Sequence, residues 1–134
     1  MGVHAAADSG YSWPFYGQIV GAYFKDHPAA QPATLMVEDA HHPSTSALPP
    51  RWQRTDEWYN FRSNPRGSVH VLLTLDESTM SGGEMGGDHP MAWCNGRSFY
   101  TAMGHSIDSY SEPLFIEHLR GGLLTAAGLA ACPK

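Results

Sequence analysis

The chain has 134 residues, enough for one domain with a hydrophobic core, and we expect a single domain over residues 1–134. Its hydrophobic content of 42% and charged content of 16% are typical of folded globular proteins and exclude a largely disordered chain. The net charge of -5 gives no sign of the basic surface that phosphate-backbone binding needs, so no nucleic-acid partner is expected. No apolar run approaches the ~20 residues that span a bilayer, so no membrane partner is expected either.

The first half of the chain predicts two or three strands and one helix. Residues 1–10 read as the end of a strand followed by a turn of small residues. Ser12 is expected to cap a helix with Pro14 in its first turn, where a missing N–H costs little. Further strands are predicted at 34–38 and 51–59. The apolar stripe of the helix is expected to comprise Tyr16, Ile19, Val20, Tyr23 and Phe24.

The second half predicts a buried strand, a hairpin and a second helix. Residues 69–75 are almost wholly apolar, as in a strand covered on both faces. Asn95-Gly96 between two strand-like runs, 91–94 and 97–102, is typical of a two-residue hairpin turn. Ser111 is expected to cap a helix over about 112–130, which Gly121-Gly122 weakens in its middle. The predicted buried stripe of that helix is Phe115, Leu119, Leu123 and Ala126.

Neither the N-terminus nor the cysteines settle where the protein is located. The N-terminus carries no basic region and no apolar region of a signal peptide, so the location stays unknown: soluble, and either cytoplasmic or secreted. Cys132 lies in the C-terminal tail and is expected to be exposed and mobile. Cys94 lies in an apolar stretch and is expected to be a small buried side chain. The sequence leaves a disulfide between the two open.

Several polar-aromatic motifs point to one family. They are GVHAAAD at 2–8, TDEWY at 55–59, DHPMAW at 88–93 and MGH at 103–105. Each places His or a carboxylate beside small residues or an aromatic ring, which suits a pocket where a sugar face stacks and its hydroxyls are hydrogen-bonded. In this order, and with DEWYNFRSNPRG at 56–67 and SFYTAMGH at 98–105, they resemble the ThuA-like, or trehalose-utilisation, family.

The resemblance implies an α/β fold related to class I glutamine amidotransferases: a flavodoxin-like sheet with flanking helices, to which the sequence adds a β-hairpin. In family members, strands and helices precede a glycine-rich strand that ends in Gly-Val/Ile-His-Ala-Ala. Matching that motif to residues 2–6 predicts that the chain corresponds to the C-terminal half, with the N-terminal half absent. A central strand without its neighbours exposes an edge, so we expect a homo-oligomer.

His4, Glu57 and His105 are the predicted catalytic residues. In the related fold, the position of His4 lies at the carboxyl edge of the sheet, where an imidazole can act as a base or a metal ligand. Alternatively its ring simply bonds a backbone carbonyl. Glu57 is the preferred carboxylate, whereas Asp56 is expected to be a solvated charge.

A divalent metal, zinc or manganese, is a possible cofactor, with His4, His89 and His105 as ligands and Glu57 as fourth ligand or base. No local spacing supports this metal site, and hydrogen bonding of the same side chains to substrate or loop backbone is the alternative. The expected substrate-binding residues are Asp8, Trp13, His27, Tyr59 and His89.

The resemblance, taken with these residues, predicts a carbohydrate-active enzyme. Its substrate would be a disaccharide such as trehalose or the 3-keto derivative, and its chemistry His/Glu acid-base catalysis of the hydrolase, lyase or isomerase type. Two alternatives stay open: a non-catalytic sugar-binding module, and a truncated remnant that is active only on assembly.

Overall fold

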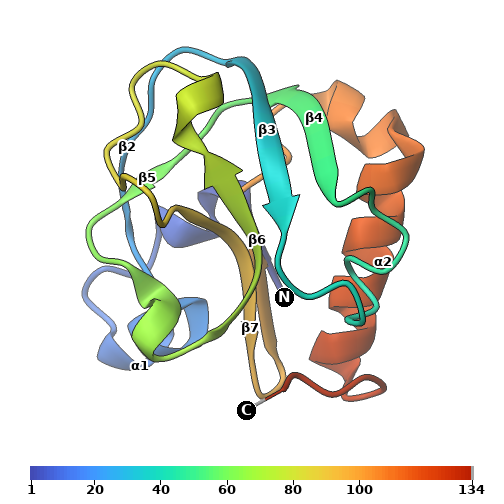
Figure 1. Cartoon of the computed structure of the whole chain (residues 1–134). Helices are drawn as coiled ribbons and strands as arrows, with labels where there is room; N and C mark the ends of the chain where they lie inside the picture. The colour runs from blue at the N-terminus through green and yellow to red at the C-terminus, as the bar shows by residue number, and fades with distance from the viewer. Residues whose placement is uncertain (134) are drawn as a thin grey trace.

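The computed structural model describes residues 1–133, which form a six-stranded sheet, a two-stranded ribbon and two helices (Figure 1). The sheet has the strand order β1-β8-β7-β6-β3-β4, and all of its pairs are antiparallel except β1 with β8. Its strands are β1 (Gly2–Val3), β3 (Gln31–Val37), β4 (Arg51–Asp56), β6 (His70–Asp76), β7 (Pro90–Asn95) and β8 (Ser98–Thr101).

The two faces of the sheet are covered differently. One face carries α2 (Pro113–Ala127), and the other carries α1 (Pro14–Val20) with the ribbon of β2 (Phe24–Asp26) and β5 (Asn60–Phe61) (Figure 1). Short 3-10 turns complete the chain: η1 (His4–Ala7), η2 (Pro65–Gly67), η3 (Glu77–Thr79) and η4 (Ile107–Ser111). Among the described residues, no helix is both long and apolar enough to cross a membrane.

The mixed α/β class is therefore confirmed, and the sheet curls so that its two edge strands approach each other. A flavodoxin-like fold requires a parallel sheet, whereas only the β1–β8 pair is parallel here. The flavodoxin-like description and the absence of an N-terminal half remain predictions.

The predicted hairpin is confirmed, with its turn displaced by one residue. Asn95 pairs with Ser98, so the two-residue loop is Gly96 and Arg97 rather than Asn95 and Gly96. Gly96 has a φ of +56°, which a residue without Cβ adopts at no steric cost.

Helix α1 is shorter than its apolar pattern predicts. It ends at Val20 because Gly21 takes a φ of +88°, and Tyr23 and Phe24 therefore lie beyond the helix. A Cβ at Gly21 would lie 2.6 Å from the indole nitrogen of Trp93, so the glycine also permits the close approach of helix and sheet. Trp13, and not the predicted Ser12, occupies the cap position, and no side chain caps the helix.

The predicted buried stripe of α2 is confirmed at Phe115, which is buried, and is wrong at Leu123. Leu123 is 60% exposed, and Glu112 rather than Ser111 precedes the first helical residue. A Cβ on Gly121 would lie 2.2 Å from the backbone of Pro43, so the glycines let the helix approach the neighbouring loop and strand β8. The buried face comprises Phe115, His118, Gly121, Gly122 and Thr125.

His118 joins α2 to the sheet as a buried, neutral imidazole. Its Nδ1 donates to the carbonyl of Ser44 at 2.9 Å, and its Nε2 lies 3.1 Å from the hydroxyl of Thr101. Burial is the main reason that the pKa of His118 falls to about 4. Burial also lowers the pKa of His42, which contacts Thr125 on the same helix.

We expect the folded protein to lose stability as the pH falls from about 6.5 towards 4. In this window the unfolded chain binds a proton at His118 that the folded chain does not bind, so acid favours unfolding. The unfolding free energy from urea titrations should be about 2 kcal/mol lower at pH 5 than at pH 7.5. His118→Gln should flatten this dependence, whereas His41→Gln, at an exposed histidine, should leave it unchanged. An unchanged pH dependence in His118→Gln would contradict the assignment.

Cys94 and Cys132 form a disulfide. The disulfide that the sequence left open is therefore present, and the prediction of an exposed, mobile Cys132 is wrong, whereas Cys94 is completely buried as predicted. Cys94 lies on the α2 face of β7, and the tail that follows α2 folds back over this face to reach it. The bond closes a loop with a sequence separation of 38 residues that contains β8 and α2.

Candidate functional site

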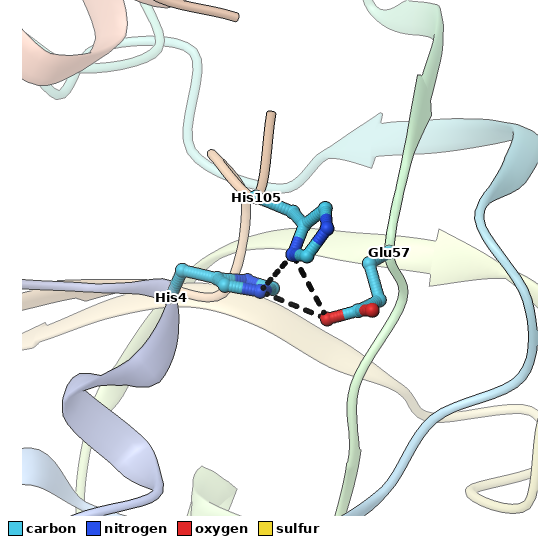
Figure 2. Close-up of side chains that lie close together, drawn as sticks. All are labelled: His4, Glu57 and His105. Atoms are coloured by element: carbon cyan, nitrogen blue, oxygen red, sulfur yellow. Dashed lines mark hydrogen bonds and ion pairs between the residues drawn. The ribbon is translucent and has the colours of Figure 1, made fainter. Parts of the chain in front are cut away.

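Three side chains from distant parts of the sequence meet at one end of the sheet (Figure 2). His4 directly follows β1, Glu57 directly follows β4, and His105 lies four residues after β8. Because β1 and β4 are opposite edges of the sheet, the curl of the sheet is what brings His4 and Glu57 together. We call His4, Glu57 and His105 the triad.

The backbone at His4 is strained, and its ring is fixed. Among the described residues, His4 is the only one other than glycine with a positive φ, +44°, at the sharp change from strand β1 to turn η1. Its Nδ1 lies 2.7 Å from the carbonyl oxygen of Ala102. A carbonyl can only accept, so Nδ1 donates this hydrogen bond, and in the neutral form of the ring Nε2 presents its lone pair to the triad.

The ligand-type atoms of the triad form a nearly equilateral triangle. His4 Nε2 lies 3.1 Å from Glu57 Oε2, and His105 Nδ1 lies 3.2 Å from each of these atoms. Ligand atoms that share one metal ion at about 2.0–2.2 Å lie about 2.8–3.6 Å apart in tetrahedral or octahedral geometry. Two imidazoles and a carboxylate with this spacing fit zinc or manganese, with coordination positions left for water or substrate.

His27 extends the cluster on the side open to solvent. Its Nε2 lies 3.3 Å from Glu57 Oε1, the carboxylate oxygen that does not face the other two histidines. Its Nδ1 lies 2.9 Å from the carbonyl oxygen of Pro28, so Nδ1 is the donor and Nε2 faces the carboxylate. The side chain of Glu57 is 14% exposed, whereas those of His27 and His105 are 37% and 50% exposed.

Asp56 is buried and not solvated, which corrects the sequence prediction. Its side chain accepts hydrogen bonds from the backbone N–H groups of Gly104 at 2.8 Å and His105 at 3.1 Å. It also accepts the N–H of Glu57 at 2.9 Å and pairs with the buried guanidinium of Arg54. One carboxylate therefore fixes the backbone of two triad residues.

Arg54 has a second carboxylate partner. Its guanidinium forms a two-pronged ion pair with Glu112, at 2.9 and 3.1 Å, and lies 4.8 Å from the ring centre of Phe115. The network therefore ties the end of β4 to the start of α2.

Tyr59 packs against the triad. The centre of its ring lies 4.2 Å from that of His4 and 4.4 Å from that of Phe24. Burial, with the neighbouring charges of Glu57 and Asp8, raises the pKa of the Tyr59 hydroxyl to about 12.

His89, which the sequence predicted as a metal ligand together with His4 and His105, lies outside the triad. Its side chain is 0% exposed. Its Nε2 donates to the backbone carbonyl of Tyr59 and its Nδ1 lies near Glu77 Oε1, both at 2.8 Å. Both ring nitrogens of His89 are engaged in this way, and the bond to the carbonyl fixes the backbone of Tyr59. His89 is therefore not placed to bind a metal together with the triad.

Within residues 1–133, neither Asp8 nor Trp13 forms a hydrogen bond, an ion pair or a ring contact with a triad side chain. Asp8 is exposed and accepts a hydrogen bond from the hydroxyl of Tyr11. Trp13 is 55% exposed and packs near Phe15 and Tyr16. Their roles in substrate binding remain predictions.

Comparisons with known proteins agree on one family. Residues 1–126 match the ThuA family, described as trehalose utilisation. The fold is similar to the crystal structure of a ThuA-like protein from Bacteroides uniformis, with a TM-score of 0.79 and 28% identity over 93% of this chain. A ThuA-like protein from Parabacteroides merdae is similar in fold, with a TM-score of 0.71 and 20% identity over 98% of this chain. The chain spans 56% and 61% of the lengths of these two proteins. No curated protein matches it.

Proposed function

Because the chain belongs to the ThuA family of trehalose utilisation, we propose that it is a metal-dependent enzyme that acts on trehalose, a related disaccharide or the 3-keto derivative. The observation that carries the proposal is the triangle of His4 Nε2, Glu57 Oε2 and His105 Nδ1, with sides of 3.1, 3.2 and 3.2 Å. Family membership supplies the substrate class, and the triangle supplies the chemistry.

The three triad atoms need a positive charge between them. In the neutral form of His4, Nε2 carries a lone pair that faces the acceptor Glu57 Oε2, so the two atoms repel unless a proton or a cation lies between them. A bound divalent cation would polarise a sugar carbonyl or hydroxyl. The hydrogen bond from His4 to Ala102 fixes the direction of the ligand lone pair, as is common for metal-bound histidines.

His27 and the second oxygen of Glu57 would supply the acid-base step. His27 Nε2 faces Glu57 Oε1 and its ring is partly exposed, so it can take a proton from a bound sugar and exchange it with water. In this proposal His4 and His105 bind and orient the metal ion. Glu57 binds the metal through Oε2 and takes part in the acid-base step through Oε1, and His27 transfers the proton.

The test is turnover by protein stripped of metal and then reloaded with Zn²⁺ or Mn²⁺. Trehalose and 3-keto-trehalose are incubated with each form, and the products are followed by NMR, which distinguishes hydrolysis, elimination and isomerisation. We expect turnover only in a metal-loaded form. Equal turnover with and without metal would reject the metal, and no turnover of either sugar would reject the enzyme.

Asp56→Asn should weaken metal binding by about 10–100-fold, the usual cost of losing a residue that orients a ligand. The substitution replaces one acceptor oxygen by an amide group and so disturbs the hydrogen bonds to Gly104 and His105. Glu112→Gln is the matched control, because it weakens the other ion pair of Arg54 and leaves the 104–105 backbone untouched. Calorimetric metal titration of both variants, with urea unfolding alongside, separates positioning from stability. Equal metal affinity in the two variants would show that Asp56 does not position the triad.

A further inference from the structure

The hydroxyl of Tyr59 differs from every other tyrosine hydroxyl of the chain. Those of the other five tyrosines donate hydrogen bonds to protein oxygens: Tyr11, Tyr16, Tyr23, Tyr100 and Tyr110. Within residues 1–133 the Tyr59 hydroxyl donates no such bond, although this residue is only 5% exposed. Throughout the described residues, every fully buried side-chain nitrogen or oxygen has a partner, so the Tyr59 hydroxyl must reach solvent-accessible space.

The rest of Tyr59 is held firmly. Its ring is packed between His4 and Phe24, and a third ring, that of His27, lies 5.9 Å away. Its backbone carbonyl accepts the hydrogen bond from buried His89, whose other nitrogen lies 2.8 Å from Glu77. A donor held this way is available to a ligand at no cost of reorganisation.

We propose that the Tyr59 hydroxyl is a catalytic residue that donates a hydrogen bond to the substrate oxygen that gains negative charge when the sugar loses a proton. This inference rests on the proposed function, because it requires a sugar bound over the triad. The ring centres of Tyr59 and His4 lie 4.2 Å apart, so the Tyr59 side chain borders the space that a sugar bound to the triad would occupy. Removing a single preorganised donor of this kind typically costs about 10²–10³-fold in kcat.

Tyr59→Phe tests the proposal, because it removes one hydroxyl and no hydrogen bond within the protein. Tyr23→Phe is the matched control: it removes the hydroxyl that donates to Gly10 at 3.0 Å, away from the triad. Both variants are loaded with Zn²⁺ or Mn²⁺ and compared with the wild type for metal affinity, urea stability, and kcat and KM on 3-keto-trehalose.

We expect Tyr59→Phe to bind metal and resist urea as the wild type does, with kcat about 10²–10³-fold lower and KM changed much less. Tyr23→Phe should keep the wild-type kcat. An active wild type with an equally active Tyr59→Phe variant overturns the role of Tyr59 alone. A wild type that binds metal but turns over no sugar overturns the proposed function and, with it, this inference.

Discussion

Glu57→Gln should abolish turnover and lower the affinity for Zn²⁺ or Mn²⁺ by more than about 100-fold, beyond the usual cost of losing a residue that only orients a ligand. The substitution keeps the shape of the side chain and removes the charge that faces both His4 and His105. If the cation stabilises the transition state by several kcal/mol, turnover should fall by about 10³-fold or more. Metal titration by calorimetry and product formation by NMR measure the two effects separately.

His4→Asn is the second variant of this prediction. Asn tolerates the positive φ at position 4 better than most residues, so the loss of the imidazole is tested without a new backbone conflict. We expect a loss of metal affinity of the same order as in Glu57→Gln.

His89→Gln and His41→Gln serve as controls, since each removes an imidazole that lies outside the triad. Both should bind metal within about twofold of the wild type. A large loss of metal affinity in His89→Gln, with normal affinity in His4→Asn, would instead favour a metal site around His89.

Loss of the Cys94–Cys132 disulfide should lower the unfolding free energy by about 4 kcal/mol. The sequence separation of 38 residues lies between loops for which chain entropy gives about 3 and about 4.7 kcal/mol. Cys132→Ser breaks the bond and leaves Cys94 shielded, because Cys94 is completely buried. Urea unfolding of the oxidised wild type and of the variant gives the difference.

The reduced wild type is the control for the disulfide. It should unfold at the same urea concentration as Cys132→Ser, since both lack only the cross-link. Thiol titration of the unfolded, unreduced protein should find no free thiol. Two free thiols, or equal stability of the oxidised wild type and Cys132→Ser, would show that the cross-link does not form in solution.

The local pattern of the sequence determined the type of most elements, though not their ends. The apolar run at 69–75 predicts strand β6 (70–76), and the turn residues around Gly96 predict the hairpin. Helix α2 also lies within its predicted range of 112–130. In each case the signal is contained within one segment, so hydrophobic period and turn chemistry suffice. The motifs also determined the family.

The face of α2 and the end of α1 depend on contacts that no local pattern contains. Gly121 weakens an isolated helix, yet here it allows contact with Pro43, almost eighty residues earlier. The burial of Asp56 could be predicted only in part from the sequence. Strand β4 alternates exposed and buried residues, and Asp56 shares the buried face of Trp52 and Arg54. Most aspartates are exposed to solvent, so exposure is the default prediction for Asp56. Its hydrogen-bond partners lie near position 104, and nothing in the sequence around Asp56 indicates them.

The sequence by itself singled out His4, Glu57 and His105 as residue types suited to chemistry, and it equally singled out His89. Only the tertiary structure decided between them. The curl of the sheet places the ends of β1 and β4 side by side, and the carboxylate of Asp56, at the end of β4, accepts hydrogen bonds from Gly104 and His105 in the segment that follows β8. His89 is directed instead into a buried pair with Glu77. The physical reason is that residues about 50 and 100 positions apart meet only through long-range packing, which leaves no periodic trace in the chain.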